Sequence, residues 1–599
     1  MTSAPADEYA ARLAARRAAH EILVAQDARL SYLRLLVFAI AALLAWLAWR
    51  DIVHPAWLVP VFAGFVVLVN RHDGVIRARD AAARGVAFYE RGLARIEDRW
   101  IGTGEPGERF RDDEHLYAND LDLFGRGSLF ELLSIARTRA GEETLAHWLK
   151  APASPDVIRR RQQGVHELSS RLDLREQLAV AGTDVRAGVH TEALVSWAAA
   201  HPVLPGAWAR ALATLLTGSA LAAAAWWAIA GDNRPFLGVV ALEVCFALSQ
   251  RRAVQQVLHR SEQPARDLDI LAHLLTHLER EQFESRRLSE LRASLDTAGV
   301  AASAAIRQLH RLSEMHTWQH NQFFGPIAAA FLWGTHVAFA IEGWRRRHGS
   351  HVAGWLATVG EFEAFTSLAA YRYEHPDDVF AAIEDGAGRT AEFEGDALGH
   401  PLIPAARMVR NDVHLGARVQ LAIISGSNMS GKSTMLRTVG INAVLALMGA
   451  PVRATRLRLT PVAVGATLRI QDSLQEGRSR FFAEITRVRR LADLAAGTPP
   501  LLFLLDELFH GTNSHDRLHG AVGVLRTLLE RGAIGLITTH DLALTEIAAG
   551  VGPRAVNVHF DDTFEAGEIR FDYRMKPGPV TRSNALALMR AVGLDVEDA

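Results

Sequence analysis

Apolar residues gather in two pairs of runs within the first half of the chain. The first pair covers residues 33–49 and 56–69 around the turn sequence RDIVHP, and the second covers 211–230 and 235–248 around GDNR. At about 1.5 Å per residue, the first two runs reach roughly 21–26 Å, less than the bilayer's hydrocarbon core of about 30 Å. We expect each pair to form a membrane hairpin. The alternative is a buried hairpin in a soluble protein.

Charged residues modify this picture at three places. Glu243 lies inside the fourth run, where lipid tolerates it only if it is paired or at the margin. A further apolar stretch, 323–341, contains His336 and is interpreted as a core helix. Arginines lie before the first hairpin and after both hairpins, whereas the short turns carry few. The positive-inside rule therefore predicts that every long segment is cytoplasmic and that the protein is a multi-pass inner-membrane protein.

The remaining pattern changes once along the chain. Apolar residues recur at three- and four-residue spacing through 120–200 and 262–375, which predicts amphipathic helices. From about residue 395, short β-branched runs alternate with helical segments: VQLAIIS, LLFLLD and AIGLITTH. Such alternation is typical of a mainly parallel sheet. The expected fold class is α plus α/β, with divisions at 1–110, 111–390 and 391–599.

Composition narrows the function classes only slightly. The net charge of −2 over 599 residues gives no basic excess of the kind that coats nucleic acid. Cys245 is the only cysteine, which excludes an intrachain disulfide and a cysteine-based zinc site.

The segment ISGSNMSGKST carries the strongest chemical signal. It fits G-x-x-x-x-G-K-[ST] between an apolar run and a helical pattern, the context of a phosphate-binding loop. Backbone N–H groups of such a loop surround phosphates, its lysine reaches the β and γ oxygens, and its serine hydroxyl holds Mg²⁺. The predicted nucleotide-binding residues are Gly426, Ser427, Asn428, Met429, Ser430, Gly431, Lys432, Ser433 and Thr434.

Two further strand ends supply candidate catalytic groups. LLFLLDE places Asp506 at the end of a buried strand, where it can bind the metal with Ser433, and places Glu507 next to it to polarise the attacking water. LITTHD ends at His540, which can contact the γ-phosphate or that water. The sequence therefore predicts an ATP hydrolase that uses Mg²⁺, with Lys432, Glu507 and His540 as catalytic residues.

The order of these motifs resembles the MutS mismatch-repair ATPases. GSNMSGKST, DELFHGTNSHD, RIQDSLQEGRSRFFAEI and GHPLI resemble that family's ATPase motifs, and NDLDLFGRGSLFELL resembles the start of its helical core. The resemblance implies a helical core with levers, an ABC-type ATPase domain, a homodimer and a link to double-stranded DNA. It also implies that Asn428 contacts the γ-phosphate, that Ser479 reaches the partner's nucleotide, and that Met408 and Tyr573 flank the adenine.

The chain departs from that family where mismatches are read. The Phe-x-Glu candidate, FYE at 88–90, lies in a helical pattern just after the first hairpin, so we expect an ordinary amphipathic helix. The basic clusters at 159–161, 286–287 and 345–347 are interpreted as solvated helix faces or as anchors to anionic lipid, rather than as contacts to DNA phosphates. The predicted function is a membrane-anchored, DNA-related ATPase that drives lever motion. The alternatives are an ABC-type transporter ATPase with fused spans and a soluble MutS-like DNA-binding protein.

Overall fold

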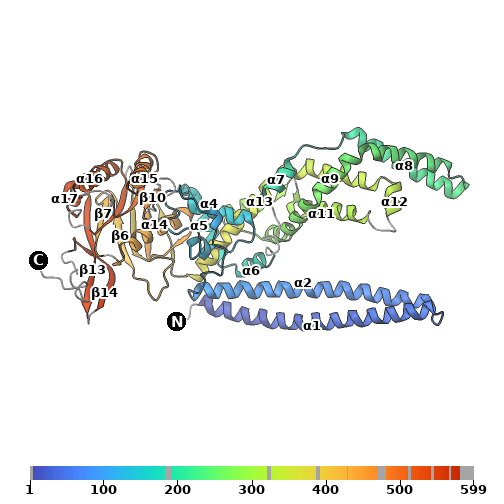
Figure 1. Cartoon of the computed structure of the whole chain (residues 1–599), viewed down its shortest axis with the longest axis horizontal. Helices are drawn as coiled ribbons and strands as arrows, with labels where there is room; N and C mark the ends of the chain where they lie inside the picture. Colours follow the sequence, from blue (N-terminus) through green and yellow to red (C-terminus); the bar gives the residue numbers. More distant parts are fainter. Residues whose placement is uncertain are drawn as a thin grey trace.

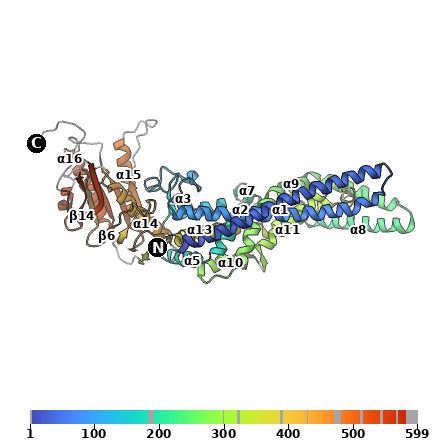
Figure 2. The same ribbon diagram turned by 90° about the horizontal axis from the view of Figure 1, so that it is seen from below.

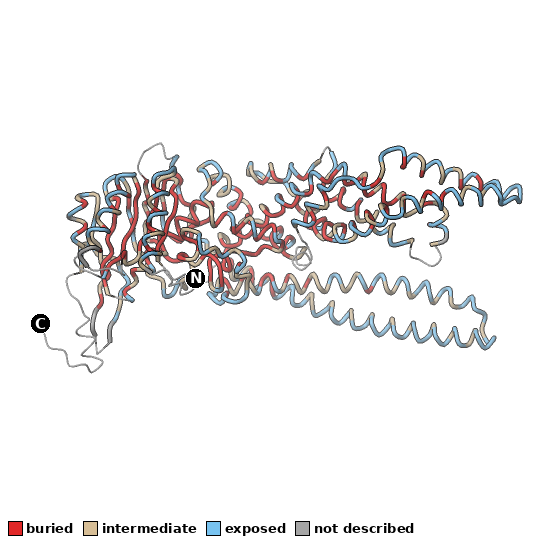
Figure 3. The backbone as a smooth tube through the Cα atoms, turned by 45° about the horizontal axis from the view of Figure 1, so that its top comes forward, coloured by how far each residue is buried: buried red, intermediate tan, exposed pale blue. Residues whose placement is uncertain are grey.

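The chain forms an elongated molecule with its sheets at one end and two helical arms at the other (Figure 1). This computed structural model describes residues 4–181, 191–297, 299–319, 325–385, 391–427, 429–468, 480–509, 514–540, 545–565 and 568–580. Burial is concentrated in the sheet end and in the helices next to it, whereas the ends of both arms are mostly exposed (Figure 3).

The first arm is an antiparallel pair of long helices, α1 (Ala4–Trp49) and α2 (Leu58–Ile96), joined through η1 (Pro55–Trp57). At about 1.5 Å per residue, α1 is roughly 69 Å long. The expected charged helix and the apolar run 33–49 are thus parts of one helix. Its base packs on the body through a buried cluster that includes Tyr9, Leu13 and Tyr89.

A chain of polar contacts crosses the first arm where its charged part meets its apolar part. Arg34 lies 2.9 Å from His72 Nδ1, and His72 Nε2 lies 2.6 Å from Asp27. Asp27 also accepts a hydrogen bond of 2.6 Å from Arg79. Beyond these residues, α1 exposes large apolar side chains up to Trp49, which is 82% exposed. The four polar residues therefore mark the boundary between the two parts.

The second arm consists of α8 (Ala207–Ala230) and the first part of α9 (Arg234–Arg280) (Figures 1 and 2). Gly231 adopts a left-handed conformation between them, with φ 74°. Buried alanines on α8, including Ala209 and Ala213, allow close helix packing. Glu243 is 1% exposed and lies beside Thr217 of α8, so it faces the helix contact.

Within the described residues, three helices are long and apolar enough to cross a membrane by length and composition: α1, the segment Pro55–Ile96, and α8. Helix α9 is not among them. Of the two runs predicted as the second membrane hairpin, 211–230 lies in α8, which meets these criteria, and 235–248 lies in α9, which does not. The apolar start of α9 contains Glu243 and continues directly into a charged helix.

Helix α13 (Trp333–Glu374) is the spine of the body and runs from the second arm to the sheet end (Figure 1). The expectation of a core helix in the third apolar stretch is confirmed for its described residues from Trp333 to Ile341, since Val337, Phe339 and Ile341 are buried. Helices around it are α3 (Leu129–Leu133), α4 (Arg139–Lys150), α5 (Pro155–Ser169), α6 (Leu172–Ala181), α7 (Thr191–Ala199), α10 (Arg286–Ala293), α11 (Ala302–Trp318) and α12 (Gly325–Ala330).

The sheet end is built on a six-stranded sheet of order β10-β11-β12-β7-β13-β14, parallel except for β14. The three expected strands are confirmed as parallel neighbours at its centre. Its strands are β7 (Leu421–Ser425), β10 (Ala463–Thr467), β11 (Leu501–Asp506), β12 (Ile534–Thr539), β13 (Ala555–Glu565) and β14 (Glu568–Pro577). Its helices are α14 (Lys432–Met448), α15 (Arg480–Ala495), α16 (Ser514–Glu530) and α17 (Ile547–Val551).

Smaller sheets join this end to α13. A four-stranded sheet has the order β4-β9-β5-β6, and β3 pairs with β8. Their strands are β3 (Val379–Phe380), β4 (Ala382–Ile383), β5 (Phe393–Leu398), β6 (Asn411–Leu415), β8 (Pro451–Val452) and β9 (Arg456–Leu459). These sheets begin at Val379, only five residues after α13 ends at Glu374, so the helical spine passes directly into the sheets.

Candidate nucleotide site

The predicted phosphate loop lies between the buried central strand β7 and helix α14, which begins at Lys432. Gly426 has φ 149° and Gly431 has φ 106°. A Cβ on Gly426 would lie 2.9 Å from the Phe560 carbonyl oxygen, and one on Gly431 would lie 3.2 Å from the Tyr573 ring. Both positions therefore require glycine for conformation and for space.

The ammonium group of Lys432 is turned into this loop. Its Nζ donates to the carbonyl oxygens of Gly426 and Ser427, each at 2.8 Å. Burial lowers the pKa of Lys432, and the negative charges of Glu507 and Asp506 oppose that shift. A phosphate group at the loop would supply the negative charge that this buried cation lacks.

Two hydroxyls of the loop show that it fits an anion with acceptor oxygens. Ser427 Oγ and Ser430 Oγ are buried and have no hydrogen-bond partner among the described residues. A buried polar atom without a partner costs roughly 1–3 kcal/mol, which a ligand at the loop would relieve. The loop residues thus suit a phosphate group, whereas a tight structural turn would leave these hydroxyls bonded within the protein.

The candidate metal ligands lie together, as expected. Ser433 Oγ donates to Asp506 Oδ2 at 2.7 Å, and the Thr538 hydroxyl donates to the other carboxylate oxygen. Asp506 and Thr538 are direct neighbours in the parallel pair of β11 and β12. A carboxylate and a hydroxyl at the rim of a phosphate loop are the oxygen ligands that Mg²⁺ prefers, so the donor set fits that ion.

The two candidate catalytic residues are also in contact. His540 Nδ1 lies 3.1 Å from Glu507 Oε1. Glu507 has φ 50°, and its backbone N–H is bonded to the Thr538 hydroxyl at 3.1 Å. That conformation is uncommon outside glycine and turns the side chain out of the strand direction. Glu507 therefore lines the pocket, where it can meet a water molecule.

A pocket of about 590 Å³ opens beside the loop. Its lining includes the predicted residues Met429, Gly431, Lys432, Ser433, Thr434, Glu507 and Tyr573. It also includes residues that were not predicted as site residues: Leu398, Leu402, Ile403, Pro404, Arg407, Val409, Asn411, Met435, Thr438 and Phe560. The GHPLI segment contains Leu402 and Ile403, and Thr438 lies one helical turn after Thr434, so sequence signals existed for these three.

Of the two residues expected to flank the adenine, Tyr573 lines the pocket and Met408 does not. Tyr573 lines the pocket, is 44% exposed, and is held through its carbonyl by Asn411 Nδ2 at 3.0 Å. Met408 is not among the described residues that line the pocket, although its neighbours on both sides are. Its sulfur packs toward Gly399, 2.3 Å from where a Cβ would stand. The structure therefore does not place Met408 among the lining residues.

The remaining predictions concern Asn428, Ser479, the FYE segment and the basic clusters. Asn428 and Ser479 lie outside the described residues. The FYE candidate is confirmed as helical, since it lies within α2. Phe88 and Tyr89 are buried in the base of the first arm. Several basic-cluster arginines are bound to carboxylates: Arg159 to Asp385, Arg160 to Asp156, Arg286 to Glu290, Arg287 to Glu361 and Arg345 to Glu342.

Comparison with known proteins agrees with this geometry. Residues 422–597 match the model of MutS domain V. A protein named DNA mismatch repair protein MutS 2, from Haloarcula marismortui, is 34% identical over 261 residues, which are 41% of this chain and 27% of that protein. Endonuclease MutS2 from Thermus thermophilus is 37% identical over 200 residues, 33% of this chain and 26% of that protein.

Each match thus spans about a quarter of the relative's length. The match to domain V begins at the central strand and includes the phosphate loop, Asp506, Glu507 and His540. Over residues 422–597, the chain is thus similar to domain V of the MutS family.

Proposed function

We propose that this protein is a membrane-anchored MutS-type ATPase that binds ATP with Mg²⁺ and hydrolyses it as a homodimer. The observation that carries the proposal is the joint geometry of Lys432, Ser433, Asp506 and Glu507 around one pocket. A glycine loop, a buried lysine, a serine–aspartate pair and an adjacent glutamate are recurring parts of sites that transfer a phosphoryl group to water.

Each side chain has a distinct part in the proposed reaction. Lys432 exchanges its two carbonyl partners for the β and γ oxygens of ATP. Ser433 and Asp506 would hold Mg²⁺, which would supply positive charge beside the phosphates. Glu507 orients water toward the γ-phosphorus and takes up its proton, while His540 fixes the Glu507 carboxylate through their contact of 3.1 Å. ADP and phosphate then leave through the open side of the pocket.

A second chain completes this site in our proposal. The family resemblance gives Ser479 the task of reaching the partner's nucleotide, and Asn428 that of contacting the γ-phosphate. Closure of two pockets against each other would draw the sheet ends together. Because α13 passes directly into those sheets, that motion would reach the helical arms as a lever stroke.

The arms supply the argument for a membrane. Both point in the same direction, and their apolar tips lie on the side away from the sheets (Figures 1 and 2). The polar residues at Asp27, Arg34, His72 and Arg79 mark the depth at which the first arm would enter lipid. The proposed location is the cytoplasmic membrane, with both arms inserted from the cytoplasm and the ATPase end in the cytoplasm.

DNA remains the proposed load because of the relatives' names. No mismatch-reading residue is assigned, since the FYE segment is in the core of the first arm. Binding would be tested with matched, mismatched and branched duplexes across salt concentrations, because contacts to phosphates weaken steeply with salt. A duplex that stimulates hydrolysis would support DNA as the load; stimulation by lipid alone would favour a membrane partner.

Two measurements test the core of the proposal. The full chain, purified in detergent, should hydrolyse ATP only with Mg²⁺, and Lys432→Ala should abolish this activity; equal turnover by the variant would refute the site. Fractionation after an alkaline wash should leave the protein in the membrane pool. Release into the soluble pool would instead favour a soluble MutS-like protein.

A further inference from the structure

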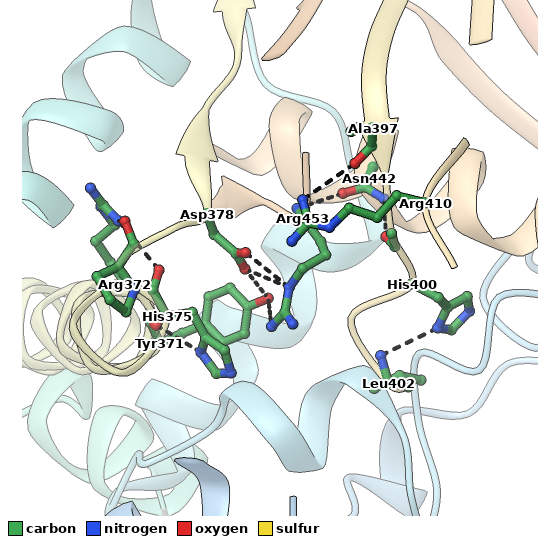
Figure 4. A network of polar contacts seen from close by, with 12 residues as sticks. Tyr371, Arg372, His375, Asp378, Ala397, His400, Leu402, Arg410, Asn442 and Arg453 are labelled. Carbon is green, nitrogen blue, oxygen red and sulfur yellow. Dashed lines mark hydrogen bonds and ion pairs between the residues drawn. The ribbon is translucent and has the colours of Figure 1, made fainter. Parts of the chain in front are cut away.

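A buried ion pair joins the end of the α13 spine to the sheet end. Arg453 Nε lies 2.9 Å from Asp378 Oδ1, and Tyr371 donates its hydroxyl to Asp378 Oδ2 at 2.8 Å (Figure 4). The antiparallel pairing of Val379 with Val452 brings the preceding Asp378 opposite the following Arg453. All three residues are at most 6% exposed, so the pair is largely shielded from water.

Arg453 is bound in turn to the helix that follows the phosphate loop. Its backbone N–H donates to Asn442 Oδ1 at 2.8 Å. Asn442 Nδ2 donates to the Gly399 carbonyl at 2.9 Å and to the Thr438 carbonyl at 2.8 Å. Thr438 lines the nucleotide pocket. One buried amide therefore ties the pocket wall, the GHPLI segment and Arg453 together (Figure 4).

A second buried cluster lies one turn further along α13 and reaches the base of the first arm. Glu374 is the last residue of α13 and lies one turn after Tyr371. Its carboxylate accepts from Arg95 Nε of α2 at 2.6 Å and from the Tyr9 hydroxyl of α1 at 3.2 Å. Arg95 and Glu374 are 3% and 4% exposed. Both helices of the arm are thus bound to one carboxylate.

His375 follows Glu374 in the chain and feels the charges of both clusters. Its ring packs on the Tyr371 ring with centroids 4.4 Å apart, and its Nδ1 lies 3.0 Å from the Tyr371 carbonyl. Burial, the positive charge of Arg453 and that of Arg95 lower the pKa of His375 to about 3. A neutral imidazole between two buried guanidinium groups adds no third charge to the network.

We propose that Asp378 and Arg453 are positioning residues for nucleotide binding, and that the network from Asn442 to Arg95 couples the occupied pocket to the first arm. Separating a buried ion pair costs several kcal/mol, so its members move together. Nucleotide that restricts the motion of the pocket lining near Thr438 should therefore also restrict the motion of the base of the first arm. Coupling between two sites is reciprocal, so a substitution that loosens the base of the arm should also weaken the binding of ATP. This coupling rests on the proposed ATPase function.

The test changes the end of the network that lies away from the pocket. In detergent-purified full chain, Glu374→Gln and Arg95→Gln should each raise the KM for ATP at least fivefold and change kcat less than twofold. Asp378→Asn should do the same, and the double variant Glu374→Gln/Asp378→Asn should raise KM no further than the larger single change. Arg453→Lys, which keeps the charge, should raise the KM for ATP less than Asp378→Asn does.

A matched control uses an exposed ion pair on the same arm. Arg17 lies 2.6 Å from Glu90, and both side chains are about half exposed, so Arg17→Gln should leave KM unchanged. Unchanged KM in Glu374→Gln and Arg95→Gln would overturn the coupling while leaving the ATPase intact. Failure of the wild type to bind ATP would instead refute the proposed function.

A second measurement needs no variant and covers the case of unfolded substitutions. Hydrogen exchange of the wild-type chain is followed with and without a non-hydrolysable ATP analogue and Mg²⁺. Amides around Tyr9 and Arg95 should exchange at least threefold more slowly with nucleotide, whereas those of α10 (Arg286–Ala293), outside the network, should not change. Equal exchange at the arm base in both states would overturn the proposal.

Discussion

His400 should make the sheet end sensitive to acid. The residue is 7% exposed, and its Nδ1 accepts a hydrogen bond from the Leu402 N–H at 3.2 Å (Figure 4). Burial and the positive charges of Arg437 and Arg453 lower the pKa of His400 to about 4, from 6.5 in the unfolded chain. Protonation would also remove the acceptor that holds Leu402, which lines the nucleotide pocket.

The sign and size of the effect follow from proton linkage. Between pH 6.5 and 4, the unfolded chain binds a proton at His400 that the folded chain does not, so stability falls as the pH falls through this window. Above pH 6.5 neither state is protonated and the contribution is constant. At about 1.36 kcal/mol per pH unit, the free energy of unfolding should fall by about 2 kcal/mol between pH 7.5 and pH 5 through this one group.

His400→Asn isolates the effect, because an asparagine oxygen can accept from the N–H two residues on without titrating. Free energies of unfolding are measured by pulse proteolysis in urea at pH 7.5 and pH 5. We expect the wild type to lose about 2 kcal/mol more than His400→Asn across this range. His259→Asn, at a side chain 89% exposed, is the control and should behave as the wild type. Equal acid sensitivity of wild type and His400→Asn would refute the reasoning.

Three further substitutions test the pocket and the arms. Glu507→Gln should slow hydrolysis by about 10²–10⁴-fold while ATP stays bound, as seen in single-turnover assays; rapid turnover would remove Glu507 as the base. Gly426→Ala should abolish nucleotide binding, because its Cβ would lie 2.9 Å from a carbonyl oxygen, whereas Gly354→Ala, which meets open space, should not. Phe38→Lys should reduce membrane retention after an alkaline wash, since a central charge costs about 3 kcal/mol in lipid, and Ile22→Lys in the charged part of the same helix should not.

The sequence predicted the phosphate-binding and metal-binding residues of the pocket better than the side chains that line the rest of it. The phosphate loop is a local pattern, and Asp506 could be placed beside Ser433 because the carboxyl ends of parallel strands share one edge. Met408 was expected to line the pocket and instead packs toward Gly399. It lies in a segment without regular structure, where neither periodicity nor strand alternation fixes the direction of a side chain.

Contacts between residues far apart in the chain could not be predicted from the sequence, because they depend on how the helices dock. Arg95 and Glu374 are 279 residues apart, and each looks like an ordinary charge on an amphipathic helix. Only the docking of the first arm on the end of α13 brings them together. The continuity of α1 was also missed: the pattern changes near residue 30 from charged to apolar, but no glycine or proline interrupts the helix there.

The distribution of apolar side chains around α1 favours lipid over a protein partner as the cover of the first arm. At about 100° per residue, the exposed residues Leu35, Leu36, Phe38, Ile40, Leu43, Trp46 and Trp49 cover an arc of about 200°. A helix that packs on one partner needs an apolar stripe of roughly half that width, and the remaining side of α1 already faces α2. A second protein helix would therefore leave large apolar side chains in water, whereas lipid would surround the whole arc at once.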